Sequence, residues 1–121
     1  MTPPDDERLL SDRNCWLASV RPNGKPHLIP IWFVWHTEKF YICTQGESVK
    51  LKNMRNNPRV SVALEDGNKP IIAEGTALLT NAPHPADVAT LFKQKYNWDI
   101  NTDAGYTTLI EVTPEKWLNW Q

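Results

Sequence analysis

The chain has 121 residues, of which 40% are hydrophobic and 22% charged, proportions typical of a soluble globular protein with one domain over 1–121. Its formal net charge is −1, so we do not expect the basic surface with which a nucleic-acid-binding protein neutralises phosphates. No apolar run approaches the roughly 20 residues of a membrane span, and the acidic start does not resemble a secretory signal. We therefore expect a cytoplasmic protein that binds neither nucleic acid nor membrane.

Hydrophobic periodicity and turn residues predict short strands interrupted by helices. The expected strands cover 14–21, 26–35, 40–44, 59–65, 70–80, 106–113 and 115–120. The expected helices are a short one that ends near residue 11, one at 48–56 and one at 85–96. Tight turns between consecutive strands favour antiparallel pairing. The sequence thus predicts a mainly β fold, a closed or partly closed barrel of six to seven mostly antiparallel strands with two or three short helices.

Some segments carry more apolar side chains than the interior of the barrel alone can bury. The strand at 26–35 is apolar on both faces, so one face would meet the interior and the other a partner chain or a ligand. Pro30 removes a ladder hydrogen bond and indicates an edge or a bulge. Trp117 and Trp120 also suggest a partner surface or a planar ligand. Residues 97–99, Asn-Trp-Asp, are open to two interpretations, a lid over a ligand or a surface loop.

The segment that begins at Thr44 combines groups suited to an anion. A strand ends at Thr44 and a helix starts near Ser48, and the first amides of a helix have no partners within it. The hydroxyls of Thr44 and Ser48 and the charge of Lys50 would complete a site for a terminal phosphate. The simpler alternative is that Ser48 only caps the helix and Lys50 is a solvated charge. With the adjoining apolar strand as a surface for a flat ring, the segment describes a site for flavin mononucleotide (FMN).

Three stretches, in this order and spacing, resemble the pyridoxamine 5′-phosphate oxidase-like family of FMN-binding split β-barrels. They are WLASVRPNGKPHLIPIWFVW, FYICTQGESVKLKNMRNNPRVSVAL and IIAEGTALL, and they fall within 16–80. The resemblance implies a split β-barrel homodimer with FMN sites between its subunits. It also implies an oxidoreductase that acts on a small planar or hydrophobic substrate, with NAD(P)H as one candidate electron donor.

The resemblance and the chemistry of the side chains together assign the cofactor-binding residues. These are Ile29, Pro30, Ile31, Trp32, Phe33, Val34, Thr44, Ser48, Val49, Lys50, Arg55 and Trp117. The first six would line the flavin ring, while Thr44, Ser48 and Lys50 would hold the phosphate. Because family members often carry a basic residue at the position of Val49, Lys50 would be the main charge, with Arg55 as a helper. The tryptophan is added for its aromatic chemistry alone.

The family resemblance leaves the activity open between several classes. Oxidases of the family carry a C-terminal Arg-x-His segment, whereas residues 117–121 are WLNWQ, so we do not expect oxidation of pyridoxamine phosphate. The chain is similar to the short reductase-like branch, part of which uses the deazaflavin F420 instead of FMN. A flavin would carry the chemistry itself, so no catalytic residue is assigned. The rival hypotheses are a non-catalytic module that holds a flavin or haem, and an interaction domain without a cofactor.

The histidines and cysteines lack the spacing of a metal site. His27, His36 and His84 show no zinc-binding pattern with one another or with Cys15 and Cys43. We expect no metal, and we expect the two cysteines to be buried free thiols in a reducing compartment.

Overall fold

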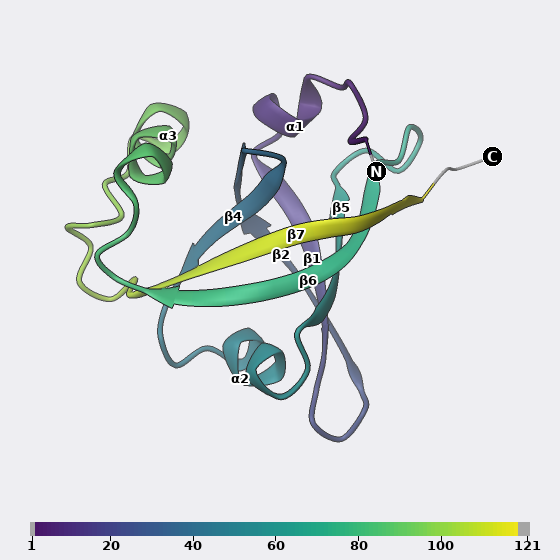
Figure 1. Ribbon diagram of the computed structural model, residues 1–121, viewed down its shortest axis with the longest axis horizontal. Coiled ribbons are helices and arrows are strands. Elements are labelled where there is room, and N and C mark those ends of the chain that lie inside the picture. Colours follow the sequence, from purple (N-terminus) through teal and green to yellow (C-terminus); the bar gives the residue numbers. More distant parts are fainter. Residues whose placement is uncertain (1, 119–121) are drawn as a thin grey trace.

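Residues 2–118, which the computed structural model describes, form one strongly curved antiparallel sheet of seven strands in the order β2-β1-β5-β6-β7-β4-β3 (Figure 1). The strands are β1 (Asn14–Val20), β2 (Pro26–Trp32), β3 (Val34–His36), β4 (Lys39–Thr44), β5 (Arg59–Leu64), β6 (Ile72–Asn81) and β7 (Thr108–Leu118). The helices within the same residues are α1 (Arg8–Ser11), α2 (Val49–Asn56) and α3 (Ala86–Tyr96). Because β2 also contacts β4, the sheet curls back on itself, and the predicted mainly β split barrel is confirmed.

The hairpin of β1 and β2 forms as its turn residues predict. Gly24 has a φ of +87°, a left-handed conformation that glycine adopts without steric cost. Among the described strands β2 pairs with β1 alone, with Trp16 opposite Pro30, and it lies at the edge of the sheet. An edge strand tolerates the ladder hydrogen bond that Pro30 cannot make, so the expected edge position is confirmed.

The strand expected at 26–35 is interrupted at Phe33. Its backbone N–H donates to the hydroxyl of Tyr96 (3.0 Å), and its carbonyl accepts from the ammonium of Lys95 (2.9 Å). Side chains of α3 therefore take the backbone groups that a continuous strand would use for its ladder. The chain leaves its pairing with β1 at this residue and joins β4 as β3.

The two strands expected at 106–113 and 115–120 are one continuous strand, β7. It pairs along β6 with a register shift at Glu74 and Gly75, where the sequence predicts a bend. A Cβ on Gly75 would overlap the carbonyl oxygen of Thr113, so the close approach of the two strands requires glycine here. The irregularity bends the pair without ending it, which explains why β7 continues past Pro114.

Two apolar cores lie on opposite faces of β4. Phe40 and Ile42 point into the barrel, whereas Tyr41 and Cys43 point towards α3. The side chains of α3 that cover this outer face include Phe92, which is fully buried. β4 is thus buried on both faces, and its end carries residues into the space beside α3. None of the described helices is long and apolar enough to cross a membrane.

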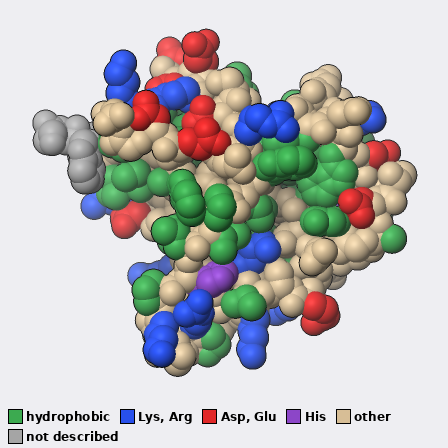
Figure 2. All heavy atoms as spheres, turned by 180° about the vertical axis from the view of Figure 1, so that it is seen from behind, with side chains coloured by type: hydrophobic (Ala, Val, Ile, Leu, Met, Phe, Trp, Pro, Cys, Tyr) green, Lys and Arg blue, Asp and Glu red, His purple; other side chains and the backbone are tan. Residues whose placement is uncertain are grey.

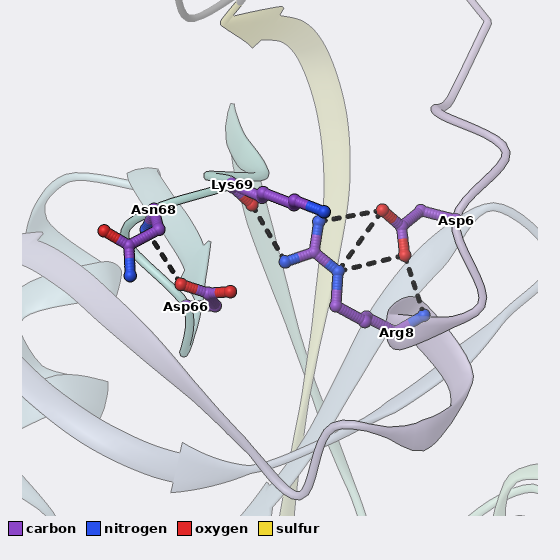
Figure 3. A network of polar contacts seen from close by, with 5 residues as sticks. All are labelled: Asp6, Arg8, Asp66, Asn68 and Lys69. Carbon is purple, nitrogen blue, oxygen red and sulfur yellow. Dashed lines mark hydrogen bonds and ion pairs between the residues drawn. The ribbon is translucent and has the colours of Figure 1, made fainter.

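A polar network fastens the N-terminal segment to the turn between β5 and β6 (Figure 3). The guanidinium of Arg8 donates to the carboxylate of Asp6 (2.8 Å) and to the carbonyl of Lys69 (2.8 Å). These bonds from Arg8 hold the pKa of the Asp6 carboxyl at about 2, below its ordinary value. Arg8 thereby fixes α1 over one end of the barrel, away from α2 (Figure 1).

Candidate functional site

A cavity of about 480 Å³ opens where the end of β4 meets α2, α3 and the loop that follows α3. Strand β2 contributes one side, the end of β4 a second, and residues 98–106 a third. The lining residues are Ile31, Trp32, Cys43, Thr44, Gln45, Lys50, Tyr96, Trp98, Asp103 and Tyr106. A cavity of this size, apolar with a few charged groups, suits a small planar ligand.

The corner at the start of α2 offers polar groups without partners. Ser48 is the N-cap residue, yet its side chain makes no capping hydrogen bond. Its Oγ is buried and, among the described residues, has no hydrogen-bond partner. A buried hydroxyl without a partner costs free energy, so this oxygen fits a place where a ligand supplies the missing bond. Thr44, buried at the end of β4, brings a second hydroxyl to the cavity wall.

Lys50 brings an uncompensated positive charge to the same corner. It lies one residue inside α2 and lines the cavity. Within residues 2–118 no carboxylate lies at ion-pair distance from its ammonium. Burial lowers the pKa of Lys50, because the charged form loses contact with water. An anion bound here would remove that penalty, and the free amides of the first helical turn would favour it further.

Aromatic rings build the opposite side of the cavity. Trp32 stacks on Tyr96, with ring centroids 4.3 Å apart and an interplanar angle of 8°. Trp98 meets Trp32 edge-on at 6.1 Å and is nearly perpendicular to Tyr106 at 5.0 Å. The indole N–H of Trp98 donates to the carboxylate of Asp103 (2.9 Å), which holds the ring in place. The arrangement can accept a flat ring and surround its edges with apolar surface.

Hydrogen bonds to the segment before α3 hold the loop after α3 in place as one wall of the cavity. Helix α3 ends at Asn97, which is left-handed with a φ of +53°. Asn101 accepts from the backbone N–H of His84 (2.7 Å), and the His84 ring donates through Nε2 to the carbonyl of Tyr106 (2.9 Å). In the cavity wall, burial first and the nearby charge of Asp103 second raise the pKa of the Cys43 thiol to about 12. The thiol is therefore protonated at neutral pH.

Only some of the residues assigned to the cofactor site line the cavity. Of the assigned residues, those that line the cavity are Ile31, Trp32, Thr44 and Lys50. The side chains of Phe33 and Val34 are buried in the two cores, and the backbone groups of Phe33 already bond to side chains of α3. Pro30 is exposed on the outer face of β2, and Ile29 packs against the barrel core.

The remaining assigned residues lie outside the lining. Ser48 is one of them, and it caps α2 two residues before Lys50, beside the cavity wall. Val49 and Arg55 are exposed on α2. Trp117 packs against Trp35 and Phe40, and it does not line this cavity. Trp120 lies outside the described residues.

Besides Trp98, which was noted only as part of a lid or a surface loop, five lining residues were not assigned to the site by the sequence analysis: Cys43, Gln45, Tyr96, Asp103 and Tyr106. Tyr96 has the spacing of a buried helix residue, and nothing local to it indicates a cavity. For the loop, the usable signal is Trp98 itself, because a tryptophan in a polar loop needs a surface to cover.

Comparisons with known proteins agree with this architecture. Among curated proteins there is no match to this sequence. An F420 reductase structure is 24% identical, with 97% of this chain and 98% of that chain covered and a TM-score of 0.77. The haem storage protein HutZ of Vibrio cholerae is 19% identical, with 87% and 83% covered and a TM-score of 0.75. General stress protein 26 of Bacillus anthracis is 24% identical, with 90% of each chain covered and a TM-score of 0.66.

At these identities the structural matches show a shared fold, and the family comes from the sequence. The family model described as pyridoxamine 5′-phosphate oxidase matches residues 1–121. This match extends over the whole chain and confirms the resemblance found in 16–80. The chain therefore belongs to the pyridoxamine 5′-phosphate oxidase family.

Proposed function

We propose that the protein is an FMN-binding oxidoreductase that acts on a small planar substrate. The observation that carries the proposal is the unpartnered Oγ of Ser48, two residues before the half-buried and unpaired Lys50, at the start of α2. This corner fits a phosphate dianion, and it adjoins a cavity walled by aromatic rings. Family membership supports the same cofactor.

In this proposal the residues of the chain bind and orient the cofactor. Lys50, Thr44 and Ser48 hold the phosphate, and the ring lies against Ile31 and Trp32 of β2. When bound, the flavin supplies hydride transfer, and the apolar walls exclude water from the ring. No catalytic residue is assigned, because the flavin would carry the redox chemistry itself.

Two alternatives use the same corner with another ligand. Similarity to an F420 reductase, with a TM-score of 0.77, favours F420 as the alternative cofactor. Similarity to a haem storage protein favours a non-catalytic module. An absorption spectrum and a mass spectrum of the cofactor released from purified protein distinguish all three.

Replacing the cavity lysine tests the phosphate corner. Lys50→Ala should weaken FMN binding by about 1.5–3 kcal/mol, because one charge-assisted hydrogen bond to the phosphate is lost. The measurement is titration of FMN into flavin-free protein, followed by quenching of flavin fluorescence. Lys52→Ala is the matched control, since Lys52 lies on the same helix but is exposed and does not line the cavity. Equal affinities of Lys50→Ala and wild type would refute this placement of the phosphate.

Catalysis is tested separately from binding. Flavin-loaded protein is mixed with NADPH in one sample and with reduced F420 in a second, both in the absence of oxygen. Rapid bleaching of the flavin by either donor supports the oxidoreductase. A flavin that stays bound and oxidised with both donors supports the non-catalytic module.

We further propose a homodimer that covers the outer face of β1 and β2. Trp16, Leu28 and Trp32 are 41%, 60% and 41% exposed, and the register places them on one face together with Pro30. Trp32 belongs both to this face and to the cavity wall, so a second copy would also close the cofactor site. Figure 2, which views the molecule from the side opposite to Figure 1, shows hydrophobic side chains in several patches on that side.

The two cysteines support placement in the cytoplasm. Cys15 and Cys43 are free and buried, and burial raises the pKa of each thiol to about 12. Such thiols are compatible with a reducing compartment.

A further inference from the structure

We propose that the part of the cavity walled by Trp98, Tyr106 and Asp103 binds a planar cationic ring, such as an N-alkylated pyridinium. The inference rests on the proposed function, because it assigns the substrate to the space that a flavin on β2 would leave. It narrows the substrate class from planar rings in general to those that carry a positive charge.

The first argument is the division of charge in the cavity. Lys50 and Asp103 are the two charged side chains of its lining. A cofactor phosphate would pair with Lys50, and the charged side chain of the lining that then remains without a partner is Asp103. Among residues 2–118 no lysine, arginine or histidine forms an ion pair with Asp103. The side-chain bond of its carboxylate comes from the neutral indole of Trp98, which leaves acceptor capacity for a cation.

The second argument is the geometry of the rings beside that carboxylate. Trp98 and Tyr106 meet at an interplanar angle of 87°, with centroids 5.0 Å apart. Two perpendicular rings form a corner in which a flat ligand can lie on one ring and touch the edge of the other. A positive charge over a tryptophan or tyrosine face is attracted by the ring quadrupole.

The third argument is that these two rings are free of the cations that occupy their neighbours. Arg13 lies over Trp32 at 5.5 Å and over Tyr96 at 4.8 Å, and Lys95 lies 5.4 Å from the Tyr96 ring. No described lysine or arginine lies over Trp98 or Tyr106. The stacked pair thus already has its cations, whereas the corner beside Asp103 has the carboxylate and the ring faces but no positive group.

A pair of probes that differ mainly in charge tests the proposal. 1-Methylnicotinamide is a planar cation, and nicotinamide is its neutral counterpart of similar shape. Both are titrated by calorimetry into flavin-loaded protein, with the flavin oxidised so that no electron transfer takes place. The cation should bind about tenfold more tightly, the effect expected for a cation–π contact reinforced by a nearby carboxylate.

Substitutions in the loop identify the source of the preference. Asp103→Asn removes the charge but keeps an oxygen that can accept from Trp98, so most of the tenfold preference for the cation should be lost and only the weaker cation–π part should remain. Asp99→Asn is the matched control, since Asp99 is an exposed acid of the same loop that does not line the cavity. It should leave the preference unchanged.

The outcomes separate this inference from the proposed function. Equal binding of both probes to the wild type, no binding of either, or a preference that Asp103→Asn leaves undiminished would overturn the inference. If the protein takes up no flavin, the proposed FMN function fails instead. The same pair titrated into the flavin-free protein then shows whether Asp103 selects the cation.

Discussion

At the scale of single residues, the hydroxyl of Tyr96 joins three parts of the chain. It accepts from the backbone N–H of Phe33 (3.0 Å) and lies within hydrogen-bond distance of the carbonyls of Arg13 (2.6 Å) and Phe33 (2.8 Å). Burial raises the pKa of this phenol to about 12, so it keeps its proton at neutral pH. It therefore remains a donor while it also accepts, and it holds the interruption between β2 and β3 beside the cavity.

Tyr96→Phe should lower the free energy of unfolding by about 1–3 kcal/mol. The ring and its packing remain, but the buried N–H of Phe33 loses its partner. Urea unfolding measures the change. The matched control is Tyr41→Phe, because the Tyr41 hydroxyl makes one longer contact, 3.2 Å to Thr37, and its removal should cost less. Equal losses in both variants would contradict the role given to Tyr96.

The same residue marks what the sequence can and cannot predict about the site. Thr44 and Lys50 were assigned from their place at a strand end and a helix start, which are local features. Tyr96 bonds to residues that lie 63 and 83 positions away in the sequence. The loop that carries Asp103 is held beside the cavity by the hydrogen bond between Asn101 and the backbone of His84. Such long-range contacts leave no periodic pattern in the sequence.

At the scale of elements, the bend in β6 and β7 shapes the long side of the barrel. Gly75→Ala should destabilise the protein by at least about 2 kcal/mol, because its Cβ would press on the backbone of Thr113, which cannot move aside without breaking the ladder. Gly67→Ala is the control, since a Cβ there meets no atom within 4 Å. Thermal unfolding of both variants measures the difference. A Gly75→Ala protein as stable as Gly67→Ala would show that the strands separate easily at this point.

The sequence largely predicted where the helices and strands lie, but it did not predict where the chain changes from one strand partner to another. The alternation of Val60, Val62 and Leu64 predicts β5, and Gly75 predicts the bend. The apolar run at 26–35 shows that both faces are covered, but a continuous strand and two strands with different partners share that pattern. What separates them is the hydrogen bonding of Phe33 to side chains of α3.

At the scale of the whole molecule, the candidate site lies where two surface regions meet. Lysine and arginine side chains gather at the lower end in Figure 2, the end at which Figure 1 shows α2 and the hairpin of β1 and β2. The basic residues of these elements are Arg21, Lys25, Lys50, Lys52 and Arg55. Their field would attract an anionic ligand, such as the proposed cofactor, towards Lys50, although the formal net charge of the chain is −1. The apolar face of β1 and β2 begins beside this basic end.

That apolar face gives the last prediction, which concerns assembly. Leu28→Glu should convert the proposed dimer into a monomer, because a carboxylate would be buried without a partner between the two copies. Leu78→Glu is a matched control, since Leu78 is 59% exposed and Leu28 60%, but Leu78 lies on β6. Sedimentation with bound flavin followed by its absorbance measures both the mass and the cofactor.

The monomer made by Leu28→Glu should also bind FMN more weakly, because Trp32 would lose the cover that the second copy provides over the cavity. A wild-type protein that sediments at 13.9 kDa with flavin bound would contradict the dimer. A dimer that survives Leu28→Glu but not Leu78→Glu would place the interface on β6. In that case the cavity would be complete within one chain, and the aromatic wall of Trp32, Tyr96 and Trp98 would alone have to exclude water from the ring.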